Sequence, residues 1–493
     1  MFNKILIANR GEIAVRVIRA CREMGIQTVA VYSEADRDCL HTMLADEAIC
    51  IGPAASTDSY LNIERILAAT VAMKADAIHP GFGFLSENAR FAKLCAECNI
   101  AFIGPSAEII NKMGNKSEAR KTMMEAGVPV VPGSKEPVHA AEDGLAMAKE
   151  IGFPVMIKAS SGGGGKGMRI SRSPEDFTEL FNAAQMESVK GFSDDTMYIE
   201  KYIEKPRHVE FQIMADKHGN VVHLGERDCS IQRRHQKVLE EAPCDVISPG
   251  LRKAMGDTAV KAAKAVGYEN AGTIEFLLDK DKNFYFMEMN TRIQVEHPVT
   301  EEITGLDLVE LQFNIAAGRK LPFRQSQIRL TGWAIECRIN AEDVQAGFTP
   351  SMGIIRRLRL PQGNHIRIET GIAPGSEITP FFDSMVAKLI VTGETREQAI
   401  ERMLSALERF HVKGIRTTVP FCKAVLHNDT YRSGDFDTSF VENRLSSPIW
   451  REPHEELLGA LFAVYTYTHE NTPEVGPDTR IDPWVLNKRI RNL

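Results

Sequence analysis

Residues 286–298 read Phe-Met-Glu-Met-Asn-Thr-Arg-Ile-Gln-Val-Glu-His-Pro, and this stretch guides the interpretation of the whole chain. Every second residue from 288 to 296 can bind an ion or a polar ligand: Glu288, Asn290, Arg292, Gln294 and Glu296. If the segment is extended, these side chains share one face, because side chains alternate along a strand. We expect metal-binding groups at one end of that face and anion-binding groups at the other. An ordinary half-buried strand alternates in the same way, so the neighbouring segments must decide.

The segment before this stretch has the composition of a partner strand. Residues 272–278 and 284–290 are apolar runs separated by a polar turn at 279–283, which predicts a β-hairpin. The hairpin places Glu275 and Glu288 on neighbouring strands among large apolar side chains. Buried carboxylates are unfavourable unless a cation compensates them, and a divalent cation that bridges nucleotide phosphates compensates both. The pattern therefore predicts Mg²⁺, with Mn²⁺ as a substitute, and phosphoryl transfer.

The composition is that of a globular chain with several domains. Of 493 residues, 43% are hydrophobic and 25% are charged, and 59 basic against 66 acidic side chains give a net charge of −7. This balance argues against nucleic acid and anionic membranes as partners. Nine scattered cysteines and the absence of an apolar targeting run predict a cytoplasmic protein with reduced thiols, and no segment reaches transmembrane length.

The patterns of apolar residues divide the chain into four parts. Residues 1–113 alternate strands with helices, which predicts a Rossmann-like, doubly wound parallel sheet. Residues 114–330, opening with a helix over about 113–127, predict a second domain in which about 131–203 form a lid subdomain. Residues 331–445, rich in short strands, predict a smaller mixed α+β domain. Residues 446–493 place prolines around an apolar helical stretch, and we interpret them as an extension for subunit interaction, with a passive packed extension as the alternative.

A glycine-rich loop at 162–167 lies between two expected strands and reads Gly-Gly-Gly-Gly-Lys-Gly. A Walker-type phosphate loop needs a following helix and a Ser or Thr after its lysine, so this motif is excluded. The loop instead predicts a hairpin tip whose backbone amides fold over phosphates, with Lys158 on the preceding strand. A merely flexible hairpin is the alternative. The first βα turn, residues 9–12, lacks the glycine fingerprint of a nicotinamide-binding fold.

Residues 226–237 concentrate cations in the sequence Glu-Arg-Asp-Cys-Ser-Ile-Gln-Arg-Arg-His-Gln-Lys. The chain is acidic overall and no aromatic residue interleaves this segment, so small phosphate or carbonate anions suit it better than nucleic acid. A solvated basic face is the alternative for most of its members. Upstream, His208, Glu210 and Gln212 alternate with apolar residues and should share one strand face.

These motifs together resemble the biotin carboxylase component of biotin-dependent carboxylases, which is an ATP-grasp family. The resemblance covers about residues 1–445 and rests on segments 7–12, 79–88, 158–168, 227–243, 288–298 and 336–342. It implies an α/β protein with an N-terminal doubly wound parallel sheet, a central ATP-grasp domain with a mobile glycine-rich lid and a C-terminal mixed α+β domain. The activity that it implies is ATP-dependent carboxylation of biotin with bicarbonate through carboxyphosphate.

The resemblance also implies roles for individual residues. Arg292, Gln294 and the Val295 amide would hold bicarbonate beside Lys237, and Glu296 would be its general base. Arg338 would stabilise the enolate of biotin. The expected metal ligands are Glu275, Glu288 and Asn290. The residues expected around ATP are Lys116, Lys158, Gly164, Gly165, Glu200, Lys201, Ile203, His208, Gln232, His235, Leu277, Glu275 and Glu288.

The implied partners follow from what full carboxylases require. The sequence contains neither a biotinyl-lysine turn nor a carboxyltransferase region, so we expect a homodimer that works with a separate biotin carboxyl carrier protein and a separate carboxyltransferase. The final acceptor, whether acetyl-CoA, another acyl-CoA or pyruvate, stays open. Two alternatives are another ATP-grasp carboxylate ligase and a catalytically silent carboxylase scaffold. Glu296 and Arg338 argue against the first alternative, and the intact charged residues of the site argue against the second.

Overall fold

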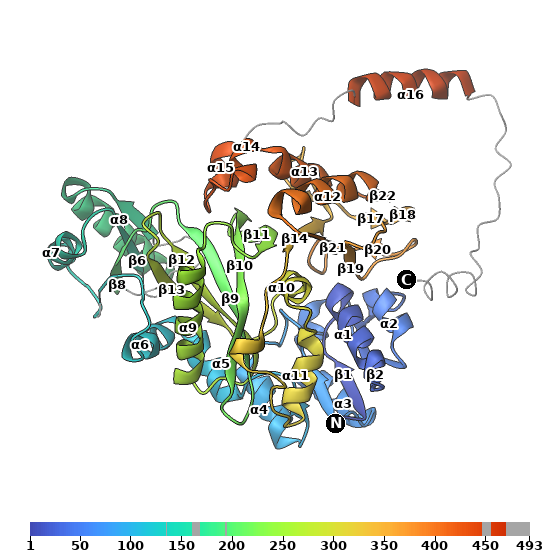
Figure 1. The fold of residues 1–493 in the computed structure, drawn as a ribbon, viewed down its shortest axis with the longest axis horizontal. Coiled ribbons are helices and arrows are strands. Elements are labelled where there is room, and N and C mark those ends of the chain that lie inside the picture. The colour runs from blue at the N-terminus through green and yellow to red at the C-terminus, as the bar shows by residue number, and fades with distance from the viewer. Residues whose placement is uncertain (135, 160–167, 193–194, 446–454, 470–493) are drawn as a thin grey trace. The chain divides into compact units, whose positions relative to one another are not determined.

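The computed structural model describes residues 1–134, 136–159, 168–192, 195–445 and 455–469 (Figure 1). The chain divides into two units, Met1–Ser447 and Pro448–Leu493. Among the described residues, no helix combines the length and the apolar character needed to cross a membrane. The two glycines expected over the phosphates, Gly164 and Gly165, lie outside the described residues.

Unit 1 begins with a parallel sheet of five strands in the order β3-β2-β1-β4-β5, which confirms the doubly wound prediction. Residues 5–7 of the central strand are fully buried, as expected where helices cover both faces. The strand order reverses between β1 and β4, which is where ligands bind in such sheets. The strands are β1 (Lys4–Ile7), β2 (Gln27–Ser33), β3 (Glu47–Gly52), β4 (Ala77–His79) and β5 (Ala101–Phe102). The helices are α1 (Gly11–Glu23), α2 (Leu40–Leu44), α3 (Ile63–Ala72), α4 (Ala89–Glu97) and α5 (Ala107–Gly114).

The helix expected over about 113–127 is two helices, α5 and α6 (Lys116–Glu125). Asn115 separates them because its backbone is extended and its side chain accepts hydrogen bonds from the amides of Ser117 and Glu118. Such a side chain satisfies amides that have no partner within the helix. The expectation of one continuous helix was therefore wrong, and the sequence signal for the break was this asparagine cap.

A small sheet with the order β7-β6-β8 forms the lid region together with two helices that pack against it. Phe177 and Phe181 lie fully buried in its own apolar core, separate from the core of the main sheets. The elements are α7 (Ala141–Ile151), β6 (Val155–Ala159), β7 (Met168–Ser171), α8 (Pro174–Phe192) and β8 (Met197–Lys201). Strands β6 and β7, which flank the glycine-rich segment in the sequence, pair antiparallel as predicted, and residues 160–167 between them lie outside the described residues.

An antiparallel sheet of eight strands, β13-β12-β9-β10-β11-β14-β21-β19, forms the centre of unit 1. It crosses the predicted domain boundary at 330, because β11 pairs directly with β14. The region from 331 to 445 thus extends the central sheet, and the domain limits stay a prediction. The strands are β9 (Arg207–Ala215), β10 (Val221–Arg233), β11 (Gln236–Ala242), β12 (Asn270–Leu278), β13 (Phe284–Asn290), β14 (Trp333–Asn340), β19 (Ile366–Thr370) and β21 (Met385–Gly393).

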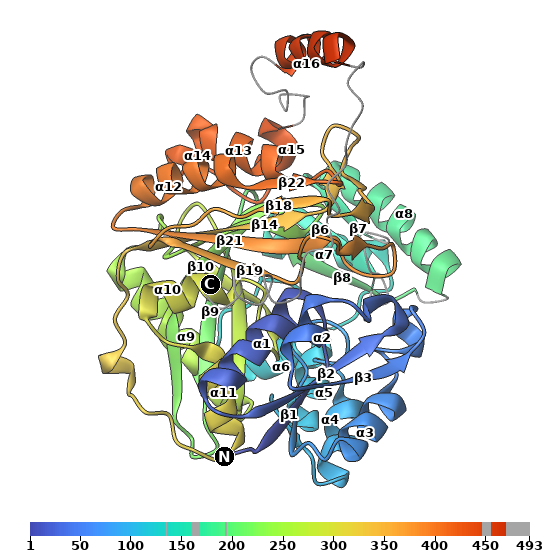
Figure 2. The same cartoon turned by 90° about the vertical axis from the view of Figure 1, so that its right-hand side faces the viewer.

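Helices cover the central sheet along its length. Helix α9 packs on β9 and β10, α10 packs on β14, and α12 packs on β21, with α12 to α14 lying together along one side (Figure 2). The helices are α9 (Pro249–Ala265), α10 (His297–Thr304), α11 (Leu308–Ala316), α12 (Arg396–Arg409), α13 (Val419–His427), α14 (Asp429–Arg432) and α15 (Phe440–Arg444). Short strands complete this region: β15 (Glu342–Asp343), β16 (Thr349–Pro350), β17 (Gly353–Ile354), β18 (Arg357–Arg359), β20 (Glu377–Ile378) and β22 (His411–Lys413).

The stretch 286–298 is only partly extended. Strand β13 ends at Asn290, residues 291–296 form a loop and a turn, and α10 begins at His297. Pro298 lies in the first turn of α10, where its missing N–H is not needed. The expected single strand face from Glu288 to Glu296 was therefore wrong beyond Asn290, because this proline favours a helix start.

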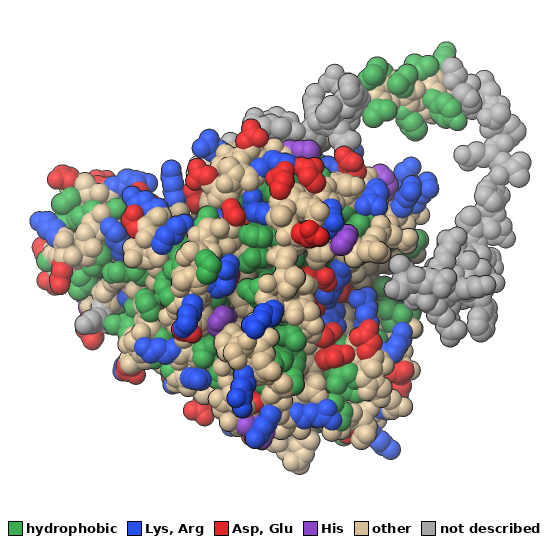
Figure 3. Space-filling model, in the orientation of Figure 1, with side chains coloured by type: hydrophobic (Ala, Val, Ile, Leu, Met, Phe, Trp, Pro, Cys, Tyr) green, Lys and Arg blue, Asp and Glu red, His purple; other side chains and the backbone are tan. Residues whose placement is uncertain are grey.

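Within unit 2, the structure describes one helix, α16 (Glu455–His469). Its apolar side chains are exposed within the described residues, with Phe462 at 70% and Leu461 at 57%. Figure 3 shows this helix as a nearly continuous band of hydrophobic side chains. On the face of unit 1 that Figure 3 shows, basic and acidic side chains are interspersed, as the near balance of charges in the sequence predicts.

Candidate active site

A cavity of about 710 Å³ opens in unit 1 between the parallel sheet and the central sheet. The loops after β1 and β4 and residues 381–385 form one wall, and strands β9 to β14 contribute the other. Many of the residues that the sequence singled out lie on this wall. They are His208, Gln232, His235, Lys237, Glu275, Glu288, Asn290, Arg292, Gln294, Val295 and Arg338.

Lys237, on β11, is the central cation of the site. Its Nζ donates hydrogen bonds to Glu210 Oε2 at 2.6 Å, Glu296 Oε1 at 2.7 Å and Glu275 Oε1 at 2.9 Å. Burial alone would lower the pKa of Lys237, but the three carboxylates raise it well above its usual value. Lys237 is therefore a permanent cation, and it brings a residue of the turn before α10 together with two residues of the central sheet.

Glu296 is fully buried between two cations. Its second oxygen, Oε2, accepts a hydrogen bond from Arg338 NH2 at 2.8 Å, and Arg338 Nε donates to Glu240 Oε1 at 2.6 Å. Burial would raise the pKa of Glu296, but Lys237, Arg338 and Arg227 hold it well below its usual range. Glu296 is consequently a carboxylate, which is the form that can accept a proton.

The loop after β13 brings an arginine and a buried amide together at the cavity. Arg292 donates to Glu87 Oε2 at 2.8 Å, Gln294 Oε1 at 2.9 Å and Asn290 Oδ1 at 3.2 Å. Gln294 Nε2 is buried, and no described residue accepts its hydrogen bond. An orphan buried donor beside an arginine suits a small planar anion, because the anion supplies the missing acceptor.

The carboxylates at the end of the β12–β13 hairpin fit a divalent cation. Glu275 and Glu288 pair across the two strands, and the pKa of Glu288 is raised first by burial and then by the charge of Glu275. Asn290 adds an amide group, whose Nδ2 donates to Glu275 Oε1 at 2.9 Å. Oxygen donors of this kind are the ligands that Mg²⁺ and Mn²⁺ prefer, so the residues present fit the expected ion.

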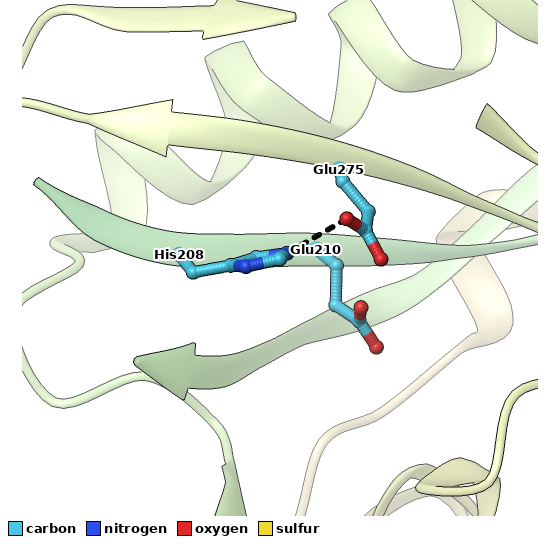
Figure 4. Close-up of side chains that lie close together, drawn as sticks. All are labelled: His208, Glu210 and Glu275. Carbon is cyan, nitrogen blue, oxygen red and sulfur yellow. Dashed lines mark ion pairs between the residues drawn. The ribbon is translucent and has the colours of Figure 1, made fainter. Parts of the chain in front are cut away.

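A histidine from β9 faces the same carboxylates. His208 Nε2 lies 2.9 Å from Glu275 Oε2, and Glu210 projects from the same strand (Figure 4). Burial would lower the pKa of His208, but Glu275 raises it above its usual value. Gln232 Nε2 lies 2.7 Å from His208 Nδ1 and fixes the ring from the other side. The ring therefore faces the Glu275 carboxylate with Nε2 and the Gln232 side chain with Nδ1.

Six of the residues expected around ATP do not line the cavity: Lys116, Lys158, Glu200, Lys201, Ile203 and Leu277. Lys158 pairs with Glu200, and Lys201 Nζ donates to the carbonyls of Gly152 and Phe153, each at 2.9 Å. Lys116 is 89% exposed, with its Nζ 3.7 Å from Glu288 Oε2. Ile203 and Leu277 are half-buried, and His235 is exposed in the β10–β11 turn. Their roles toward ATP stay a prediction.

The structure adds residues to the site that the sequence interpretation did not include. Glu240 and Glu87 hold the two arginines, Arg338 and Arg292. Arg227, fully buried, donates to Glu210 Oε1 at 2.5 Å and lowers the pKa of Glu296. Glu87 lies in the segment 79–88, so the sequence could have indicated it as a site residue. The pairing of Glu240 with Arg338 depends on strand register, which no local sequence pattern shows.

The fold and the site define the class of the protein. A hairpin lid beside an antiparallel sheet, with paired carboxylates and cations at its end, is the architecture of an ATP-grasp ligase. Residues 115–324 match the family model "Carbamoyl-phosphate synthase L chain, ATP binding domain", and residues 1–110 and 336–443 match the N-terminal and C-terminal domains of biotin carboxylase. The chain belongs to the biotin carboxylase family.

Relatives of similar length agree with this assignment over most of their sequences. The chain is 55% identical over 443 residues to biotin carboxylase 1 of Bacillus subtilis, which covers 90% of this chain and 98% of the relative. It is 52% identical over 442 residues to one of the pyruvate carboxylase subunits of Methanothermobacter thermautotrophicus, covering 90% of each.

Solved structures support the same family. The biotin carboxylase domain dimer of 2-oxoglutarate carboxylase from Hydrogenobacter thermophilus, in complex with MgADP, ADP and bicarbonate, is 50% identical, with a TM-score of 0.83 over 92% of this chain and 99% of that one. The biotin carboxylase of Campylobacter jejuni is 48% identical, with a TM-score of 0.84 over 90% of this chain and 99% of that one. The activity of the chain is ATP-dependent carboxylation of biotin with bicarbonate.

Proposed function

We propose that Glu296 is the general base of this biotin carboxylase and that the biotin is carried by a separate protein. The observation that carries the proposal is the position of Glu296. Its carboxylate is bonded at once by Lys237 and Arg338 and lies in the loop that carries Arg292 and Gln294. An ionised carboxylate among cations, beside a site for a small anion, is what deprotonation of bicarbonate requires.

In the first step, Arg292, the Gln294 amide and the Val295 N–H hold bicarbonate beside Lys237. Glu296 removes the bicarbonate proton, and the resulting carbonate oxygen attacks the γ-phosphorus of ATP. The bond to the β-phosphate oxygen breaks, which yields carboxyphosphate and ADP. Bound bicarbonate is an anion and also interacts with the ammonium group of Lys237. This partly neutralises the charge that lowers the pKa of Glu296, so the pKa rises and Glu296 becomes a stronger base.

Glu275, Glu288 and Asn290 would hold Mg²⁺ or Mn²⁺, which neutralises phosphate charge when bound. Around the nucleotide we place Lys116, Lys158, Glu200, Lys201, Ile203, His208, Gln232, His235 and Leu277, with the amides of Gly164 and Gly165 over the phosphates. The pairing of Lys158 with Glu200 supports this arrangement. Lys158 lies on β6 and Glu200 on the neighbouring strand β8, so the ion pair holds the ammonium group over these two strands of the lid region. Because Lys158 belongs to the lid region, its ammonium group would contact the phosphates of ATP when the lid lies over the nucleotide.

In the second step, carboxyphosphate separates into carbon dioxide and phosphate. The phosphate removes the N1 proton of biotin, and the N1 nitrogen then attacks the carbon of carbon dioxide. Arg338 stabilises the enolate that biotin forms on losing this proton. Glu240 supports this role because its Oε1 lies 2.6 Å from both Nε and NH2 of Arg338, which fixes one edge of the guanidinium group beside Glu296 on the cavity wall.

The chain acts with partner proteins in the cytoplasm. We place the biotin on a biotin carboxyl carrier protein, the transfer to the acceptor on a carboxyltransferase subunit, and two copies of this chain in a homodimer. Relatives named as subunits of multi-subunit carboxylases, and the dimer of the Hydrogenobacter domain, support this assembly. The domain limits at 113, 330 and 445 and the extension 446–493 form part of the same proposal. The acceptor is acetyl-CoA, another acyl-CoA or pyruvate.

The test is ADP release by the purified protein with Mg-ATP, with bicarbonate and free biotin each added or omitted. We expect turnover that depends on bicarbonate and rises with biotin, and we expect Glu296→Gln to abolish it while leaving ATP binding intact. Full turnover in Glu296→Gln would exclude this residue as the base. Turnover that ignores bicarbonate would exclude the proposed first step.

A further inference from the structure

We propose that Lys388 is a positioning residue, which orients the turn carrying Glu296 by holding the carbonyl group of Val295. The proposal rests on the role of Glu296 proposed above and adds a residue that lies outside the cavity wall. Lys388 is on β21, its side chain is 0% exposed, and its Nζ donates a hydrogen bond to Val295 O at 2.7 Å.

The carbonyl that Lys388 holds belongs to the peptide group that joins Val295 to Glu296. Rotation of this peptide would redirect the Cα–Cβ bond of Glu296 and with it the carboxylate, while the Val295 N–H, on the proposed bicarbonate site, belongs to the preceding peptide group. The preceding carbonyl, Gln294 O, lies 2.8 Å from His297 Nδ1, so two successive carbonyls of the turn are held from outside the cavity. A misplacement of about 1 Å at a reacting group can cost ~100-fold in rate, so the support of this turn affects catalysis.

The other contacts of Glu296 cannot supply this orientation alone. Lys237 and Arg338 both bond its carboxylate, and both are proposed to bind bicarbonate or biotin during the reaction. Their hydrogen bonds to Glu296 therefore change as substrates bind. Lys388 is buried behind the turn and contacts its backbone, so its bond can persist through the whole cycle.

The charge of Lys388 is balanced by a residue of the parallel sheet region. Glu12 Oε2, in the first turn of α1, lies 3.2 Å from Lys388 Nζ, and Glu12 is 4% exposed. Glu336, on the neighbouring strand β14, is fully buried, and the charge of Lys388 acts on it. A buried ammonium is unfavourable without such partners. Lys388 thus links α1, β21 and the turn before α10, which are far apart in the sequence.

A charge-neutral pair of substitutions separates positioning from stability. Lys388→Met alone would leave Glu12 buried without its cation, so we compare the double variant Glu12→Gln/Lys388→Met with Glu12→Gln alone. We expect kcat/KM for bicarbonate to fall ~10-fold or more between the two, with KM for ATP unchanged, because supporting residues of this kind affect activity by about 10- to 100-fold. Glu12→Gln/Lys388→Leu serves if the methionine variant does not fold.

The matched control is Lys4→Met. Lys4 Nζ also bonds a carboxylate, Glu47 Oε1 at 2.6 Å, and a backbone carbonyl, Met73 O at 3.1 Å, but it lies in the parallel sheet away from the cavity. We expect Lys4→Met to change the melting temperature without changing kcat/KM for bicarbonate. If the folded double variant keeps the bicarbonate kinetics of Glu12→Gln, the positioning role is wrong. Full activity of Glu296→Gln would instead overturn the role of Glu296 as general base, on which this proposal rests, whatever the Lys388 variants show.

Discussion

Lys237 stabilises the site at the scale of a single residue, since one ammonium group compensates Glu210, Glu275 and Glu296. Removing one partner of a buried ion pair leaves its counter-charges without compensation, which costs about 3–5 kcal/mol. We expect Lys237→Met to lower the free energy of unfolding in urea by this amount and to abolish ADP release. The control is Lys253→Met, whose exposed pair with Asp257 should contribute under about 1 kcal/mol. Equal losses in the two variants would contradict the compensation argument.

Glu240 gives the fold a dependence on pH. Burial, opposed by Arg338 and reinforced by Glu296, raises the pKa of Glu240 to about 7 from its ordinary value of 4.5. Between these values the folded protein keeps a proton that the unfolded chain has released, so this residue lowers stability as the pH rises through the window. We expect Glu240→Gln to gain stability relative to the parent between about pH 5 and pH 7.5, measured as unfolding free energies in urea. A difference that stays constant with pH would rule this out.

Most charged residues of the cavity could be predicted because they lie close together in short segments of the sequence. Glu288, Asn290 and Arg292 lie two residues apart, and Glu275 is on the paired strand of the same hairpin. Arg338 came only from the family resemblance, and its partner Glu240 depends on the register between β11 and β14. Pairings between distant strands are set by tertiary packing, which leaves no mark in a local pattern.

At the scale of elements, the approach of α1 to the loop after β19 depends on one glycine. A Cβ atom at Gly371 would lie 2.5 Å from the carbonyl carbon of Gly11 and 2.8 Å from the Glu12 nitrogen. We expect Gly371→Ala to push α1 away and to lower the free energy of unfolding by about 1–3 kcal/mol, as overpacking does. KM for bicarbonate should rise as well, because Glu12 pairs with Lys388 behind the Glu296 turn.

Gly250→Ala is the control for this substitution. Gly250 lies in α9, and no atom other than its helix and chain neighbours comes within 4 Å of the added Cβ. Alanine favours helix more than glycine does, so the control should be neutral or stabilise by up to about 1 kcal/mol. If both variants unfold at the same urea concentration as the parent, the close approach at Gly371 does not limit packing.

Strands and helices with a clear pattern of apolar residues were predicted well. Element ends that depend on tertiary contacts were not. The parallel strands β1, β2 and β4 and the β12–β13 hairpin follow from apolar runs bounded by turns. The end of β13 at Asn290 did not follow, because the alternation of polar residues continues to Glu296 while the backbone leaves the strand. Glu296 reaches Lys237 and Arg338 through a turn, and Arg292 contacts Glu87 instead, which only the folded chain shows.

For the whole molecule, the cavity lies where three sequence regions meet. The loops of the parallel sheet, the β9–β13 strands and Arg338 of β14 all contribute to its wall, and no one region closes it. The continuous sheet from β13 to β19 explains why, since β11 and β14 hold Lys237 and Arg338 on adjoining strands. Stability and activity should thus depend on Met1–Ser447 as one unit.

Shortening the chain after Ser447 tests this division. The cavity and its hydrogen bonds belong to unit 1, so we expect the shortened protein to keep its melting temperature and its ADP release with free biotin. The apolar side chains of α16 would be lost with unit 2, and we expect binding to a carboxyltransferase partner, measured by calorimetry, to weaken at least ~10-fold, as loss of a few buried aromatic and aliphatic anchors does. Loss of activity with free biotin would show that unit 2 supports the catalytic unit itself. Unchanged partner binding would remove the assignment of unit 2 to subunit interaction.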